Sequence, residues 1–266
     1  MKPLPAYATT PAPTAEVVRL LLLGPGGWGK STAAATFPNP VFIDFDNNLP
    51  AEFAGKYPTI PMWNREWLLT QKLSMNPSIL GSAIANRPLM FLPQIFKDIS
   101  TLDSDQTVVF DHLSAISDLL AICIKEDNSA EIKKNPYAFW AMWAEFLSAL
   151  FDGIRKTRCN VVMICHEDEL REPETNRLLG RRWLLPGQKF SPKVPTYFNN
   201  VFRQCRTYDV NRGGTLAVPG ALTAQTAKLD YLWQIRPDAE FQYARTTIPG
   251  DKLYVKATYQ SFLSRA

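Results

Sequence analysis

Nine residues near the start of the chain have the types and spacing that bind a phosphate chain. The pattern G-x-x-x-x-G-K-[ST] is matched by Gly24-Pro25-Gly26-Gly27-Trp28-Gly29-Lys30-Ser31-Thr32. Glycines let backbone N–H groups surround phosphate oxygens, because no Cβ intervenes and positive φ is permitted. In such a loop Lys30 would lie against the β- and γ-phosphates, and the Ser31 hydroxyl would bind Mg²⁺. The pattern predicts a nucleoside triphosphate site, with Trp28 either stacked on a neighbouring surface or shielding the phosphates.

Polar side chains also follow three apolar runs further along the chain. Asp46 ends the run that starts at residue 41, Asp111 ends the run from residue 107, and His166 ends the run from residue 160. Parallel strands of an open α/β sheet end at the side where ligands bind, so these side chains should lie beside the glycine loop. Asp111 also matches the Walker B pattern, an apolar strand followed by Asp that holds Mg²⁺. His166 has a second interpretation, an ordinary histidine satisfied in the core.

The elements that must hold these groups alternate between strands and helices. Apolar runs predict buried strands at 17–23, 41–46, 107–112 and 160–166, and helices are expected at 30–37, 94–102, 113–124 and 137–155. A short helix and a short strand at 59–60 should fill part of 47–63, and 125–136 should be a solvated charged segment. Short runs after residue 207, including a hairpin at 208–216 and a strand at 229–235, predict C-terminal β-hairpins. The predicted fold is therefore α/β, a mainly parallel sheet flanked by helices.

Composition limits the class of protein. The chain has 266 residues, of which 46% are hydrophobic, and a net charge of +4. This size suits one large domain over 16–266, preceded by a Pro-, Ala- and Thr-rich tail over 1–15 that is either flexible or an arm docked on a neighbouring subunit. Four cysteines without metal-binding spacing indicate reduced thiols. Because no apolar run reaches membrane-spanning length and no signal core is present, we expect a cytoplasmic protein without membrane partners.

The amino-acid composition changes in the segment after the fourth predicted strand. No acid occurs from Asn176 to Tyr208, and aromatic side chains lie among basic ones. Cations suit the phosphates of a nucleic acid and aromatic faces suit its bases, so this composition favours contact with a single strand. The alternative is a solvated basic loop whose aromatics pack on the domain. The basic residues are Arg177, Arg181, Arg182, Lys189, Lys193, Arg203 and Arg206.

The order of these parts resembles the RecA-like P-loop ATPases, and most closely the phage-encoded Sak-type family of RecA-like recombination ATPases. The resemblance covers about residues 17–250. It rests on the glycine loop 24–32 and on Phe42–Asp46, Val108–Asp111, Val162–His166, Leu185–Gly187, Pro195–Val201 and Ile235–Asp238 followed by Arg245. The loop is specific for nucleotide binding, whereas the other segments gain weight from their order.

The resemblance implies roles for individual residues. Asp46 takes the place of the acid, usually Glu, that activates the attacking water, so either the water lies closer or hydrolysis is slow. His166 takes the place of a polar γ-phosphate sensor that is often Gln. Residues 167–206 correspond to the DNA-contacting loop region, with Arg177, Arg181, Arg182, Lys189 and Lys193 as its DNA-binding cations. Arg245 stands where a motif, often Lys-x-Arg, reaches a neighbouring subunit's nucleotide, although here Tyr243-Ala244 precede it and the lysine is missing.

The resemblance also implies an activity and partners. We expect an ATPase that uses ATP and Mg²⁺, forms a homo-oligomeric ring or filament, and acts on single-stranded DNA in phage recombination, annealing or replication. It would work in the host cell cytoplasm beside a phage or host single-strand binding protein. Two alternatives remain open. One is a ring helicase or helicase loader, and the other is a nucleotide-bound structural or partner-binding switch with little hydrolysis.

Overall fold

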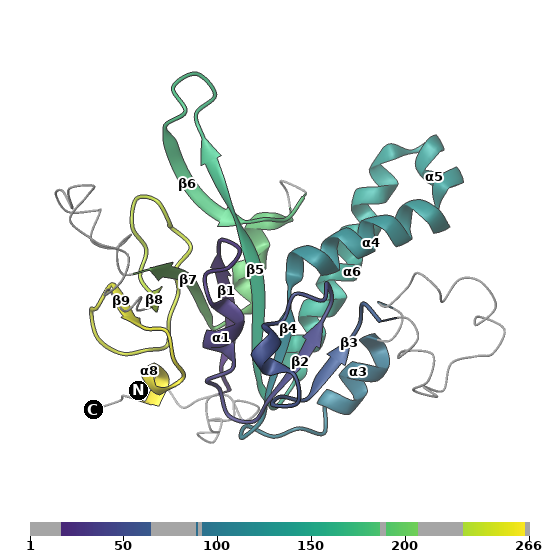
Figure 1. Ribbon diagram of the computed structural model, residues 1–266. Helices are drawn as coiled ribbons and strands as arrows, with labels where there is room; N and C mark the ends of the chain where they lie inside the picture. Colours follow the sequence, from purple (N-terminus) through teal and green to yellow (C-terminus); the bar gives the residue numbers. More distant parts are fainter. Residues whose placement is uncertain (1–16, 65–88, 90–91, 187–189, 207–230, 264–266) are drawn as a thin grey trace, which may run out of the picture.

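A computed structural model describes residues 17–64, 89, 92–186, 190–206 and 231–263 (Figure 1). The N-terminal tail expected over 1–15, the hairpin expected at 208–216 and the candidate DNA contact Lys189 lie outside these residues.

The centre of the molecule is a mainly parallel sheet. Its strand order is β3-β2-β4-β5-β1-β7-β8-β9, and β6 pairs with the outer part of β5. Strands β1 to β5 and β7 pair in parallel, whereas β8, β9 and β6 pair antiparallel to their neighbours. The bounds are β1 Arg19–Gly24, β2 Pro40–Asp44, β3 Thr59–Pro61, β4 Thr107–Asp111, β5 Asn160–Arg171, β6 Leu178–Trp183, β7 Asn200–Arg206, β8 Tyr231–Gln234 and β9 Tyr254–Lys256.

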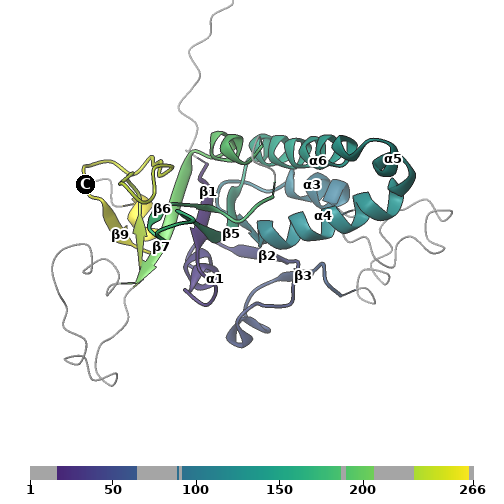
Figure 2. The same ribbon diagram turned by 90° about the horizontal axis from the view of Figure 1, so that it is seen from above.

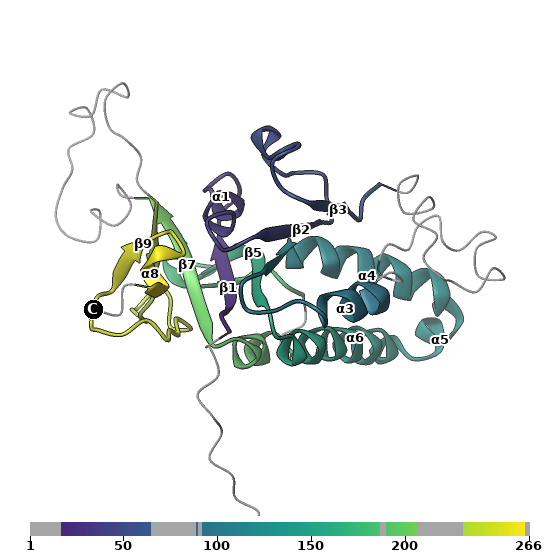
Figure 3. The ribbon, with the colours of Figure 1, turned by 90° about the horizontal axis from the view of Figure 1, so that it is seen from below.

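Helices cover both faces of this sheet. Figures 2 and 3 show α3, α4 and α6 together on one face and α1 on the other. The bounds are α1 Lys30–Ala34, η1 Ala51–Phe53, α3 Leu92–Ile99, α4 Leu113–Asp127, α5 Ser129–Lys134, α6 Pro136–Lys156, η5 Ser191–Tyr197 and α8 Gln260–Leu263. The predicted α/β fold, a mainly parallel sheet flanked by helices with C-terminal antiparallel strands, is confirmed.

Strand alternation explains why the core has two parts. Successive side chains of a strand point to opposite faces. In β1, Leu21 and Leu23 join the core beneath α3, α4 and α6, whereas Leu20 and Leu22 join the core on the α1 side. Because the central strands are buried on both faces, they read in the sequence as continuous apolar runs.

The segment after His166 differs from the expected loop. Strand β5 continues past His166 to Arg171 and forms a hairpin with β6, which projects from the sheet in Figure 1. The last part of the expected loop region is β7, a buried strand that pairs in parallel with β1. The expectation that 167–206 is one loop region is therefore corrected, because both ends of that range belong to regular strands.

Candidate nucleotide site

The glycine loop wraps one side of a cavity of about 530 Å³ at the carboxyl ends of the parallel strands. Gly29 precedes α1 with φ of 72°, a left-handed conformation that favours glycine. An added Cβ there would lie 3.3 Å from the Tyr231 ring, so a side chain would also be crowded. At Gly29 the loop therefore presents backbone rather than a side chain.

Lys30 is a buried cation whose ammonium bonds only to backbone oxygens among the described residues. Its Nζ donates to the carbonyl oxygens of Gly24, at 2.8 Å, and Pro25, at 2.7 Å. Burial lowers the pKa of Lys30, and the nearby Asp111 carboxyl opposes that shift. A buried ammonium without a paired carboxylate is costly, which favours an anion beside it.

Ser31 and Asp111 place two hard oxygen donors together at the cavity. Ser31 Oγ donates to Asp111 Oδ2 at 2.5 Å, and both residues line the cavity. Burial raises the pKa of Asp111, and the hydrogen bond from Ser31 opposes this. Oxygen donors of this kind are the ligands that Mg²⁺ prefers.

Asp46 reaches the same cavity and has two different oxygens. Its Oδ2 accepts from His112 Nε2 at 2.9 Å and from Asn48 Nδ2 at 2.8 Å. Its Oδ1 is buried and has no partner within the described structure. Burial raises the pKa of Asp46, but the hydrogen bonds from His112 and Asn48 outweigh it and hold the pKa below its ordinary value. Asp46 is therefore a carboxylate at the cavity with one oxygen that the described residues leave unpaired.

His166 lines the cavity as well, and its ring lies against a second histidine. His166 Nε2 and His112 Nε2 are 3.2 Å apart, and the two rings meet edge to face. Burial and the neighbouring His112 and Lys30 lower the pKa of His166 to about 4. The imidazole of His166 is thus neutral near pH 7, as a hydrogen-bonding group at this position requires.

The sequence analysis missed His112, Asn48 and Tyr231, which all line the cavity. His112 directly follows the predicted Walker B aspartate, and that adjacency was the available signal. Tyr231 lies within the strand predicted at 229–235, but it comes close to the glycine loop only because of the order of the strands in the sheet. The role of Trp28 is partly resolved, because the Arg206 guanidinium lies 4.9 Å from its ring centroid and donates to the Gly27 carbonyl.

Comparison with known proteins supports a family assignment. A family model described as AAA domain matches residues 16–206. The chain belongs to this AAA domain family. Among solved structures, the crystal structure of the RadB recombinase is similar, at 14% identity over 84% of each chain with a TM-score of 0.33. No curated protein matches the chain.

Two further properties of this AAA domain follow from its described residues. None of its helices is long and apolar enough to cross a membrane. Within the same residues no cluster of three or more His, Cys, Asp or Glu side chains could hold a metal ion by itself.

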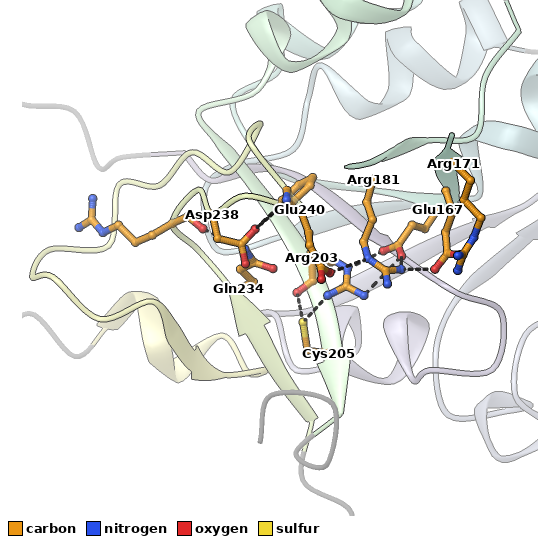
Figure 4. Close-up of polar contacts among 11 residues, drawn as sticks. Glu167, Arg171, Arg181, Arg203, Cys205, Gln234, Asp238 and Glu240 are labelled. Carbon is orange, nitrogen blue, oxygen red and sulfur yellow. Dashed lines mark hydrogen bonds and ion pairs between the residues drawn. The ribbon is translucent and has the colours of Figure 1, made fainter. Parts of the chain in front are cut away.

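The arginines of the β5–β6 hairpin are paired with acids that precede them. Figure 4 shows Arg181 and Arg203 converging on Glu167, whose side chain is 2% exposed. Arg181 also pairs with Glu169 at 2.6 Å and Glu240 at 3.2 Å. Burial alone would lower the pKa of Arg181, but these carboxylates raise it well above its ordinary value.

The other predicted DNA contacts are more accessible. Arg182 pairs with Asp168 at 2.9 Å, and both side chains are about one-third exposed. Arg177 and Lys193 are exposed at the surface. The aromatic part of the DNA expectation is wrong for Trp183, Phe190 and Phe198, because these side chains are buried in the core and offer no free face to a base.

Arg245 lies away from the cavity of its own chain. Its backbone pairs with Val201 near the amino end of β7, whereas the cavity lies at the carboxyl ends of the strands. The residue is exposed. A contact between Arg245 and a nucleotide would therefore involve a neighbouring subunit, as its predicted trans-acting role requires.

Proposed function

We propose that the protein is a RecA-like ATPase that binds and hydrolyses ATP with Mg²⁺ and acts on single-stranded DNA. The proposed setting is phage recombination, annealing or replication in the host cytoplasm, as in the Sak-type family that the sequence resembles. One observation carries the proposal. The buried cation Lys30, the Ser31–Asp111 pair and the carboxylate residue Asp46 all line one cavity beside the glycine loop.

Each of these residues fits one part of a phosphoryl transfer. The loop N–H groups of residues 24–32 and Lys30 bind the phosphates, and Ser31 Oγ with Asp111 would hold Mg²⁺. When bound, Mg²⁺ neutralises charge that develops on the phosphate oxygens. The Asp46 carboxylate orients the attacking water, while His166 as a neutral imidazole offers a hydrogen bond to the γ-phosphate.

The test is ATP hydrolysis by the purified protein with and without single-stranded DNA. We expect turnover that requires Mg²⁺ and rises with DNA. Lys30→Ala should lower turnover by about 100-fold or more, because the γ-phosphate loses its buried cation. Undiminished hydrolysis in this variant would contradict the proposed site.

Two other outcomes would change the proposed task. ATP binding with negligible turnover would favour the nucleotide-bound switch, which the short side chain of Asp46 and its two hydrogen bonds would then explain. ATP-dependent unwinding of a tailed duplex would favour a helicase. Particle imaging in the same conditions would show whether the homo-oligomer is a ring or a filament, and pull-down would test binding to a single-strand binding protein.

A further inference from the structure

His112 occupies a position between the strand that carries Asp111 and the helix α4. It directly follows β4 and is the N-cap of α4, where its Nδ1 accepts from the Ala115 backbone N–H at 3.1 Å. The residue is 9% exposed. Asn, Asp, Ser and Thr are the side chains that cap helices best. A histidine differs from these side chains because it has a second ring nitrogen, Nε2, that the cap does not use.

The cap determines which nitrogen carries the proton. Because Nδ1 accepts a hydrogen bond from a backbone N–H, a neutral imidazole must carry its proton on Nε2. That Nε2 lies 2.9 Å from Asp46 Oδ2 and 3.2 Å from His166 Nε2. The His112 side chain, at the N-terminus of α4, thus donates its Nε2–H to Asp46, and the ring of His166 lies next to this nitrogen.

The donor acts on one of the two oxygens of Asp46. Oδ2 receives His112 and Asn48, which leaves the buried Oδ1 as the oxygen without a partner among the described residues. Two hydrogen bonds to one oxygen fix the rotation of the carboxylate. A short aspartate at this place has less reach than the glutamate usual in RecA-like enzymes, so its orientation matters more.

We infer that His112 is a positioning residue for ATP hydrolysis, which holds the Asp46 carboxylate in a fixed orientation at the cavity for the attacking water. The inference rests on the proposed function. It requires that His112 contributes to the rate of the chemical step and little to the binding of ATP. A purely structural cap would affect folding stability instead.

Two substitutions separate the two nitrogens of His112. In His112→Asn the amide oxygen can replace Nδ1 as the cap, but the side chain is too short to reach Asp46. In His112→Gln the amide nitrogen can replace Nε2 as the donor to Asp46, but the cap is lost. Asn135→Ala is the matched control, because Asn135 caps α6 through the Tyr137 N–H at 3.1 Å, away from the cavity.

The experiment measures kcat and KM for ATP, binding of a fluorescent ADP analogue, and melting temperature. His112→Asn should lower kcat by about tenfold or more with KM and nucleotide affinity within about twofold, since only positioning is lost. His112→Gln should keep kcat within about threefold while its melting temperature falls by about 2–4 °C, as in Asn135→Ala.

The outcomes distinguish this inference from the function on which it rests. If the wild-type protein turns over ATP and His112→Asn is equally fast, the inference is overturned and the proposed function stands. A folded His112→Gln protein that is as slow as His112→Asn would also overturn it. If the wild-type protein neither binds nor hydrolyses ATP, the proposed function fails and the inference fails with it.

Discussion

Burial sets the charge of individual residues at the nucleotide cavity. His166 lies beside the buried Lys30 and the ring of His112, and its pKa is lowered to about 4. Near pH 7 the site therefore combines a cationic Lys30 with a neutral His166. In the proposed function, this separation lets Lys30 compensate phosphate charge while His166 forms hydrogen bonds without adding a second cation.

The low pKa of His166 predicts a pH dependence of stability. In the unfolded chain His166 binds a proton below pH 6.5, whereas the folded protein binds it only near pH 4. The contribution to stability is complete above pH 6.5 and is lost as the pH falls toward 4. His166→Gln lacks this titration. From pH 7 to pH 5 the free energy of unfolding of the wild type should therefore fall by about 1 kcal/mol more than that of the variant, a value that includes a reduction because His166 is partly exposed to solvent.

Denaturant unfolding of both proteins at pH 7 and pH 5 measures this difference directly. Titrating groups that lie far from His166 affect both proteins alike and cancel in the comparison. An equal change for wild type and variant would mean that His166 is as easily protonated in the folded protein as in the unfolded chain.

The place of a single residue in the site was predictable where a local sequence pattern is enough to indicate its role. Lys30, Ser31 and Asp111 follow patterns whose geometry is local, and the structure brings them together as expected. His112 was not recognised, because its contacts with Asp46 and His166 depend on which strands are neighbours. Register places Asp44 beside Asp111 and Gly24 beside His166, and no single segment contains that information.

Secondary-structure elements were predictable where apolar runs are continuous. The strands β1, β2, β4 and β5 are buried on both faces, so the sequence shows them as runs of aliphatic residues. Strand β7 was missed because buried polar residues interrupt its run. Arg203 donates to Glu167 at 2.7 Å, and Gln204 Oε1 accepts from Trp233 Nε1 at 2.9 Å, so both contacts are with distant segments.

The β5–β6 hairpin shows why a run of basic residues did not give a uniformly positive surface. Acids of β5 stand opposite arginines of β6, as in the register pairs Asp168 with Arg182 and Glu169 with Arg181. Paired charges on facing strands stabilise a hairpin. The more accessible cations Arg177, Arg182 and Lys193 are therefore better candidates for DNA contact than Arg181.

Binding of single-stranded DNA provides the test of this element. The double variant Arg177→Ala/Arg182→Ala should bind a DNA strand more weakly and reduce the magnitude of the slope of log K against log salt by about 1.4, because each of the two phosphate contacts on a single strand contributes about 0.7. Lys97→Ala on α3 removes an exposed cation elsewhere and is the control. Fluorescence anisotropy over a salt series measures the slope, and an unchanged slope would reject the hairpin as a DNA surface.

At the scale of the whole molecule, the sheet separates the nucleotide cavity from Arg245. The cavity lies at the carboxyl ends of the parallel strands, and Arg245 pairs with Val201 toward the other end of β7. One chain cannot easily bring Arg245 to its own nucleotide. The trans-acting role proposed for this residue therefore predicts that complete sites form only between subunits.

Mixing two inactive variants tests that prediction. Lys30→Ala retains Arg245 but lacks a working cavity, whereas Arg245→Ala retains the cavity but lacks the arginine. If the arginine acts in trans within a homo-oligomer, an equal mixture should recover about a quarter of wild-type ATP turnover, because one interface in four then pairs an intact cavity with an intact arginine. A mixture no more active than the sum of the separate proteins would show that Arg245 does not complete a neighbour's site, and full activity of Arg245→Ala alone would show that no such arginine is needed.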